Sequence, residues 1–323
     1  MNRLSNGRVY ITLLIILLLG FSGYMLRNYL NMDGRGMPGS NEREKIHASE
    51  TLCVSENSYG TPGTAAATVN NVSGAEVKTG DKTSDTPMAA LSNNKRGWGL
   101  KRNKEHYQPE MPSSISSTLN KYGAYWIGSP KGKVVYLTFD EGYENGYTSI
   151  ILDTLKSNGV KAAFFVTGHY LKNQPELVKR MVDEGHIVGN HTNTHPSLPD
   201  VSNGQIKKEL QVVEKMYEDI TGKKNMKYLR PPKGEYSERT LAVTRELGYH
   251  NIFWSMAMVD WVPMSGGPEQ AYRGVMDNLH NGALILLHAV SRDNSMALDR
   301  ILKDIKAQGY AFKTLDDLAK EQL

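Results

Sequence analysis

Short apolar runs alternate with amphipathic stretches from Lys133 to the C-terminus, and one pair recurs about every thirty residues. This alternation is typical of strand and helix units arranged around a parallel sheet. Seven runs qualify as strands, at 134–139, 162–167, 186–190, 226–230, 251–255, 284–288 and 311–313. Because seven successive units can curl a sheet nearly closed, we predict an α/β fold, an irregular (β/α)7 barrel.

Polar and ionisable residues stand where the first six predicted strands end. In α/β barrels the chemistry is carried by the loops at the C-terminal ends of the strands. Residues scattered at random would fall at both ends of the barrel, so their gathering at one end predicts a functional site there. In chain order these residues are Asp140 with Glu141, His169, His191, Arg230, Asp260 with Trp261, and His288.

His191 and His195 are four positions apart in GNHTNTHPSL. This spacing predicts that both imidazoles lie on one side of a helical turn, where they could bind one metal ion. A carboxylate from Asp140 or Glu141 would complete a three-ligand site with an open position for water. Zinc suits such nitrogen and oxygen ligands, and cobalt, manganese or nickel would fit as well. The alternative is a purely structural histidine pair.

An open divalent metal site makes hydrolysis the expected reaction class, because the metal lowers the pKa of bound water and polarises a carbonyl. Amide hydrolysis also needs a base for the water and an acid for the departing amine. The carboxylates at 140–141 can supply the base. His288 can supply the acid, with Asp260 favouring the protonated imidazole. Arg230 precedes two prolines and is expected to pair with an acid such as Asp140, a structural ion pair being the alternative.

The N-terminal part differs in composition from the rest. Residues Val9 to Leu26 form an apolar run without a charge, close to the length that spans a membrane. Arg3 and Arg8 precede this run, which predicts a cytoplasmic N-terminus and a remainder outside the cytoplasm. We expect an uncleaved membrane anchor at 1–30, with a cleaved signal peptide as the alternative.

Residues 31–97 are rich in Ser, Thr, Gly, Asn and Ala and show no sustained periodicity. Such a segment cannot bury enough apolar surface to offset its ordering entropy. We therefore predict a flexible linker, with a small degraded domain as the alternative. The catalytic domain is then expected at 98–323, held outside the cytoplasm by the membrane anchor.

Charge and cysteine content exclude other classes of protein. The formal net charge is only +4, and the Lys and Arg residues are dispersed among acids, so nucleic acid is not an expected partner. Cys53 is the only cysteine, which rules out an intramolecular disulfide and a cysteine-rich zinc site.

Five motifs in this order resemble those of carbohydrate esterase family 4, the polysaccharide deacetylases: YLTFDEGYENGYT, GNHTNTHPSL, LRPPKGEYS, VDW and ILLHAV. Longer runs, among them FFVTGH, FWSMAMVDW, LLHAVSRDN and the upstream WGLKRNKEHYQPE, are similar to one branch of that family. This branch is the delta-lactam-biosynthetic N-acetylmuramic acid deacetylases of spore-forming bacteria. The resemblance covers roughly residues 98–323 and implies the barrel of the polysaccharide deacetylase type.

The resemblance implies a role for eight residues of this chain. They comprise a base, the arginine that orients it, two metal ligands, an acid pair, a backbone N–H for the oxyanion and an aromatic wall of the acetyl pocket. In that order they are Asp140, Arg230, His191, His195, Asp260, His288, Lys233 and Trp261.

Glu141 departs from the family pattern, which has a second, metal-binding aspartate at this position. Glutamate keeps the charge and the ligand atoms but adds a methylene. We therefore expect Glu141 to bind the metal, and the substitution Glu141→Ala to impair the retention of zinc.

The branch implies hydrolytic deacetylation of N-acetylmuramic acid in peptidoglycan glycan strands, leading to muramic delta-lactam in the spore cortex. The expected location is the membrane, through the N-terminal helix, with the catalytic domain facing the cortex. One alternative is a deacetylase of N-acetylglucosamine in peptidoglycan or chitin-like oligosaccharides, because the five motifs serve every such substrate. A second alternative is a catalytically inactive carbohydrate-binding protein.

Overall fold

The computed structural model describes residues 91–103 and 105–322. The predicted membrane anchor at 1–30 and most of the predicted linker at 31–97 lie outside the described residues. Within the described ranges, no helix is both long enough and apolar enough to cross a lipid bilayer.

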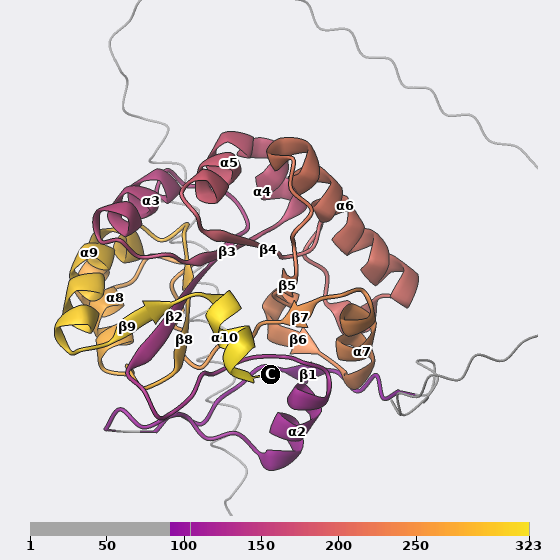
Figure 1. The fold of residues 1–323 in the computed structure, drawn as a ribbon, viewed down its shortest axis with the longest axis horizontal. Coiled ribbons are helices and arrows are strands. Elements are labelled where there is room, and N and C mark those ends of the chain that lie inside the picture. The colour runs from indigo at the N-terminus through magenta and orange to yellow at the C-terminus, as the bar shows by residue number, and fades with distance from the viewer. Residues whose placement is uncertain (1–90, 104, 323) are drawn as a thin grey trace, which may run out of the picture. The chain divides into compact units, whose positions relative to one another are not determined.

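A seven-stranded parallel sheet forms the centre of the described part (Figure 1). Its spatial order is β7-β5-β4-β3-β2-β8, and β9 pairs with the first residues of β2 on the edge that β3 uses further along. Each predicted strand overlaps one strand of this sheet, although β5 and β7 are only two residues long. The strands are β2 (Val134–Glu141), β3 (Ala163–Val166), β4 (Ile187–Asn190), β5 (Tyr228–Leu229), β7 (His250–Asn251), β8 (Ala283–His288) and β9 (Ala311–Lys313).

The segment after β7 brings the two edges of the sheet toward each other. Met256 donates its N–H to the carbonyl of Leu284 at 3.2 Å and accepts the N–H of Leu286 at 2.9 Å, both in β8. The sheet therefore curls toward closure, and the predicted α/β architecture is present as a partly closed barrel.

Helices surround this sheet (Figure 1). Side-chain caps begin several of them: Thr167 starts α4, and Ser202, Ser237 and Ser291 start α6, α7 and α9. The helices of the described part are α2 (Ser113–Lys121), α3 (Thr148–Ser157), α4 (Gly168–Asn173), α5 (Pro175–Asp183), α6 (Asn203–Thr221), α7 (Glu238–Glu246), α8 (Gly267–Met276), α9 (Arg292–Ala307) and α10 (Leu315–Gln322).

No strand or helix was predicted before the repeat, yet the segment there packs on the barrel. Strand β1 (Arg96–Gly97) pairs antiparallel with β6 (Glu235–Tyr236). The carbonyl of Ser92 accepts a hydrogen bond from the N–H of Arg239 at 3.0 Å. The folded part therefore begins several residues before the predicted linker ends, because backbone pairing across the chain orders this polar segment.

Side chains alternate between two cores along the strands, as the pleat of a β-strand requires. On β2, Val135, Leu137 and Phe139 pack against the helices, whereas Tyr136 faces the interior of the barrel. Helix α10 contributes Leu315 and Leu318 to the same interior core. Even-numbered residues of β2 therefore point inward, and this register decides which side chains reach the site.

Candidate active site

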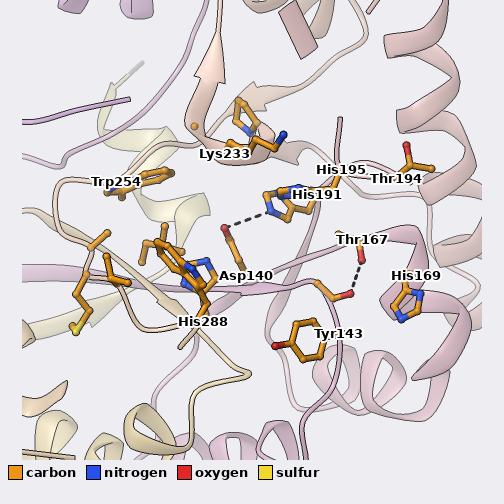
Figure 2. A pocket seen from close by; sticks show the side chains of 18 of the residues that line it. Asp140, Tyr143, Thr167, His169, His191, Thr194, His195, Lys233, Trp254 and His288 are labelled. Atoms are coloured by element: carbon orange, nitrogen blue, oxygen red, sulfur yellow. Dashed lines mark hydrogen bonds and ion pairs between the residues drawn. The ribbon is translucent and has the colours of Figure 1, made fainter. Parts of the chain in front are cut away.

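A pocket of about 990 Å³ opens at the C-terminal ends of the strands (Figure 2). The side chains predicted from the strand ends meet here, with the exceptions given below. Its walls are formed by Arg102, Asp140, Gly142, Tyr143, Thr167, His169, His191, Asn193, Thr194, His195, Pro231, Lys233, Gly234, Trp254, Ala257, Met258, Val259, Trp261, Leu286 and His288.

Asp140 stands at the inward-facing end of β2 and pairs with Arg230. The guanidinium donates to Asp140 Oδ1 at 2.7 Å, and it also donates to Thr138 Oγ1 at 2.9 Å. The Arg230 side chain is fully buried, with its charged group 4.2 Å from the centre of the Phe165 ring. The predicted pairing of Arg230 with Asp140 is therefore present, and the fixed fork of the guanidinium holds the carboxylate in one orientation.

Two opposing effects set the protonation of Asp140. Burial alone would raise its pKa, but the charges of Arg230, His191 and His288 outweigh burial and hold the pKa of this carboxyl below its usual range. Asp140 Oδ2 lies 3.6 Å from His191 Nε2. Asp140 is therefore an ionised carboxylate at neutral pH, with Oδ1 held by Arg230 and Oδ2 turned toward the histidines.

His191 and His195 lie on a loop after β4, here called the histidine loop. The prediction that they share a helical turn is wrong. Thr192 and His195 adopt left-handed backbone conformations, with φ of 67° and 59°. Side chains hold this shape, since Asn190 Oδ1 accepts the N–H of Thr192 at 2.8 Å and Thr192 Oγ1 accepts that of His195 at 3.0 Å. The buried Glu209 of α6 accepts a further bond from Thr194 N–H at 2.7 Å. These local bonds replace the helical pattern that the spacing suggested.

The two imidazoles have the character of metal ligands. Their ring centres are 4.8 Å apart, and His191 Nδ1 contacts the carbonyl of Arg230 at 2.8 Å, which leaves Nε2 as the ring nitrogen that could bind a metal ion. Burial lowers the pKa of His191. Burial, followed by the charge of His191, lowers the pKa of His195 to about 4. Both rings are therefore neutral at neutral pH, as metal binding requires.

Glu141 does not join the two histidines. It follows Asp140 on β2, so the pleat turns it to the helix side, where the charge of Glu144 acts on it and it does not line the pocket. Neither of its carboxylate oxygens has a hydrogen-bond partner in the part of the chain that the structure describes. Burial, with the charges of Glu144 and Asp140, raises the pKa of Glu141 well above its usual value. This arrangement gives no support to Glu141 as a metal ligand.

A divalent metal thus fits the site in part. Among the described residues, no group of three or more His, Cys, Asp or Glu side chains is arranged to hold a metal ion. The two neutral imidazoles fit, whereas the predicted third ligand faces away. The Asp140 carboxylate lies beside these histidines, with its Oδ2 3.6 Å from His191 Nε2.

His288 ends β8 opposite Asp140, because the two residues are register partners on neighbouring strands. Its Nδ1 contacts Asp260 Oδ1 at 2.7 Å, and its backbone N–H donates to Asp260 Oδ2 at 2.9 Å. Asn294 also donates to Asp260 Oδ2, at 2.5 Å. Burial alone would lower the pKa of His288, but the hydrogen bond to Asp260 and the charges of Asp140 and Asp260 raise it. The predicted pair of Asp260 and His288 is formed, with His288 Nε2 left to the pocket.

Lys233 and Trp261, for which the resemblance implies an oxyanion contact and an aromatic wall, both line the pocket. Lys233 has a left-handed backbone with φ of 60°, inside the turn that follows Pro231 and Pro232. The Trp261 ring lies edge-on to His288 at 5.1 Å and is 52% exposed. Trp261 is therefore placed to cover whatever binds beside His288.

Several residues that build or support the pocket were not predicted from the sequence. Thr167 and Asn193 could have been found, because they follow strands as the predicted residues do. Glu209 gave no signal, since it lies inside a helix and acts through the histidine loop. Arg102 precedes the repeat, and the family-like run WGLKRNKEHYQPE that contains it gave no indication that it lines the pocket.

Comparison with known proteins agrees with this geometry. The family model "Polysaccharide deacetylase" matches residues 127–252. Peptidoglycan-N-acetylmuramic acid deacetylase PdaA of Bacillus subtilis (strain 168) is 48% identical over 234 residues, which span 72% of this chain and 89% of that protein. A peptidoglycan-N-acetylglucosamine deacetylase of Bacillus cereus is 35% identical over 207 residues, 62% of this chain and 74% of that protein.

A solved structure is similar as well. Bacillus subtilis PdaA, described as a family 4 carbohydrate esterase, matches with a TM-score of 0.70 and 47% identity, covering 72% of this chain and 100% of that chain. The chain therefore belongs to the polysaccharide deacetylase family, and it is a hydrolytic N-deacetylase.

Proposed function

We propose that this chain removes the acetyl group from N-acetylmuramic acid in the glycan strands of peptidoglycan. The observation that carries the chemistry is the pairing of Asp140 and His288 across neighbouring strands, each held by its own partner, Arg230 and Asp260. The choice of sugar is supported by the 48% identity to a peptidoglycan-N-acetylmuramic acid deacetylase over 89% of that protein.

Asp140 serves as the base of this reaction. Its Oδ1 is occupied by Arg230, so Oδ2 is the oxygen that accepts a proton from the attacking water. The lowered pKa keeps the carboxylate ionised and ready to accept that proton. Arg230 acts through Asp140, by fixing the carboxylate and balancing its charge.

His288 serves as the acid. Asp260 holds the Nδ1 side of the ring, and the raised pKa keeps the imidazole protonated over more of the neutral range. Nε2 then gives its proton to the amine that leaves the acetyl carbon. The backbone N–H of Lys233 is proposed to bind the oxyanion that forms on the acetyl oxygen.

His191 and His195 are the residues that would hold a divalent metal, with zinc the best suited to them. Such a metal supplies a lowered pKa for water and polarisation of the acetyl carbonyl when it is bound. The chain itself contributes two neutral imidazoles on a loop that the protein shapes before any ligand arrives.

The product of this reaction suggests its place in the cell wall. On muramic acid without a stem peptide, the freed amine lies beside the lactyl carboxyl of the same sugar, which favours closure to a lactam. We propose the spore cortex as the location of that lactam. We further propose that residues 1–30 anchor the chain in the membrane, and that the deacetylase domain lies outside the cytoplasm.

Mass spectrometry of glycan strands tests this function. Purified strands with and without stem peptides are incubated with the full chain and zinc. We expect acetyl to be lost from peptide-free muramic acid, and Asp140→Asn to abolish the loss. Loss from glucosamine alone would support the N-acetylglucosamine alternative, and no loss from either sugar would support an inactive carbohydrate-binding protein.

A further inference from the structure

The charges around the pocket are unbalanced. Of the described residues that line it, Asp140 is the only acid, and the buried Arg230 already balances its charge. Arg102 and Lys233 also line the pocket, and neither forms an ion pair with any acid in the described ranges. The pocket therefore has positive charge available for an anionic group on the substrate.

Arg102 is the better placed of the two cations to bind such a group. Its Nη2 donates to the backbone carbonyl of Ala257, a bond that fixes the guanidinium at the pocket wall. A guanidinium has five N–H donors, and within the described residues Ala257 is the only acceptor that contacts it. Several donors are therefore left for a ligand, and the side chain is exposed to the solvent in the pocket.

The segment that carries Arg102 is tied to the barrel on both sides of this residue. Trp98 stacks on Phe253 at 4.3 Å and donates its ring N–H to the carbonyl of Trp254 at 2.9 Å. Gln108 donates to the carbonyl of Gly128 at 3.0 Å. Arg102 is therefore held in place before substrate binds, which lowers the entropy cost of using it.

Muramic acid offers the matching anion. It differs from glucosamine by a lactyl ether on the ring carbon adjacent to the carbon that bears the acetylated nitrogen. The lactyl group ends in a carboxylate when the stem peptide is absent and in a neutral amide when the peptide is attached. We propose that Arg102 binds this lactyl carboxylate, and so determines the preference for peptide-free muramic acid. This inference rests on the proposed function, and it adds the residue that recognises the substrate.

The test changes both partners of the proposed contact, the Arg102 side chain and the lactyl carboxylate. The full chain carrying Arg102→Gln is compared with the unchanged chain on two substrates: peptide-free glycan strands, and the same strands with the lactyl carboxyl converted to a methylamide. We expect Arg102→Gln to lower kcat/KM about tenfold or more on the free acid, mainly through KM, because a charge-assisted pair is lost. On the methylamide the two proteins are expected to be equal, and Arg102→Lys to fall between them on the free acid.

A matched control is Lys101→Gln, which removes one positive charge from the adjacent residue. Lys101 pairs with Glu110 at 2.6 Å and does not line the pocket, so no change is expected on either substrate. An equal loss on both substrates with Arg102→Gln would overturn the proposal and leave Arg102 a structural contact of Ala257. No loss on either would overturn it too, while the proposed function would stand. An unchanged chain that deacetylates neither substrate would remove the proposed function itself.

Discussion

Asp140 and Glu141 are adjacent carboxyl groups at the end of one strand, and their surroundings are opposite. Asp140 faces the pocket, pairs with Arg230, and has a lowered pKa because nearby positive charges outweigh burial. Glu141 faces the helices, lacks a hydrogen-bond partner among the described residues, and has a raised pKa because burial is reinforced by neighbouring acids. Adjacent carboxyl groups on one strand thus lie in opposite environments because successive side chains point to opposite faces of the sheet.

The largest expected effect is on catalysis, and it should fall on one of these two residues only. Asp140→Asn removes the proton acceptor, and kcat is expected to drop by about 10²–10⁴-fold. Glu141→Gln, the matched change on the other face, should alter kcat by no more than about twofold, since the residue does not line the pocket. Release of acetate from glycan strands measures both. Equal losses would mean that Glu141 also acts in the site.

The free energy of unfolding should depend on the ion pair between Arg230 and Asp140. Arg230→Met leaves Asp140 buried without its counter-charge, and the free energy of unfolding is expected to fall by about 3–5 kcal/mol. The double variant Asp140→Asn with Arg230→Met should lose less than the sum of the single variants. Urea unfolding is the measurement. Lys215→Met, which breaks an exposed pair with Asp219, serves as the control and should leave stability unchanged.

The pH dependence of the rate should report on His288. Its pKa is raised in the folded protein, so the protonated acid is present below that pKa and is lost as pH rises through it. Asp260→Asn removes the negative charge that raises this pKa and leaves at most a weaker, neutral hydrogen bond to Nδ1. The falling alkaline limb of the pH–rate profile is therefore expected to move to lower pH, with little change in the acid limb. If the alkaline limb did not move, a group other than His288 would be responsible for it.

The smallest expected effect concerns metal binding by Glu141. Because Glu141 faces away from the histidines, Glu141→Gln should change zinc affinity by no more than about twofold, against a loss of roughly tenfold or more for His195→Ala. Titration calorimetry on the metal-free protein measures both values. A loss with Glu141→Gln similar to that of His195→Ala would restore the sequence-based expectation that glutamate replaces the family's aspartate as a ligand.

Much of the barrel could be predicted because its signals are local. Each of the seven strands overlaps an apolar run of the sequence, and most of the polar residues predicted at the ends of the first six line one pocket. The direction of Glu141 was within reach of the same reasoning, since a residue next to an inward-facing Asp140 on a strand must face outward. The prediction of a metal ligand at Glu141 followed the family motif and did not take the alternation of side chains along the strand into account.

Other features depend on contacts that sequence spacing does not reveal. The histidine loop takes its shape from Asn190 and Glu209, which overrule the helical turn that a four-residue spacing favours. The segment around Arg102 lacks periodicity, so no strand or helix was predicted there, although the motif resemblance placed it in the catalytic domain. Trp98 orders it through Trp254, a contact across 156 positions of the chain.

Strand β2 pairs with β3, which follows it closely in the chain, and also with β8 and β9, which are made last. The hydrogen bond from Thr138 to the carbonyl of Ile285 joins positions 147 residues apart. At a synthesis rate of roughly 5–20 residues per second, Asp140 leaves the ribosome on the order of ten seconds before β8 exists. The growing chain thus carries the proposed base before the proposed acid, His288, has been made. We expect a chain that ends before β8 to have no deacetylase activity.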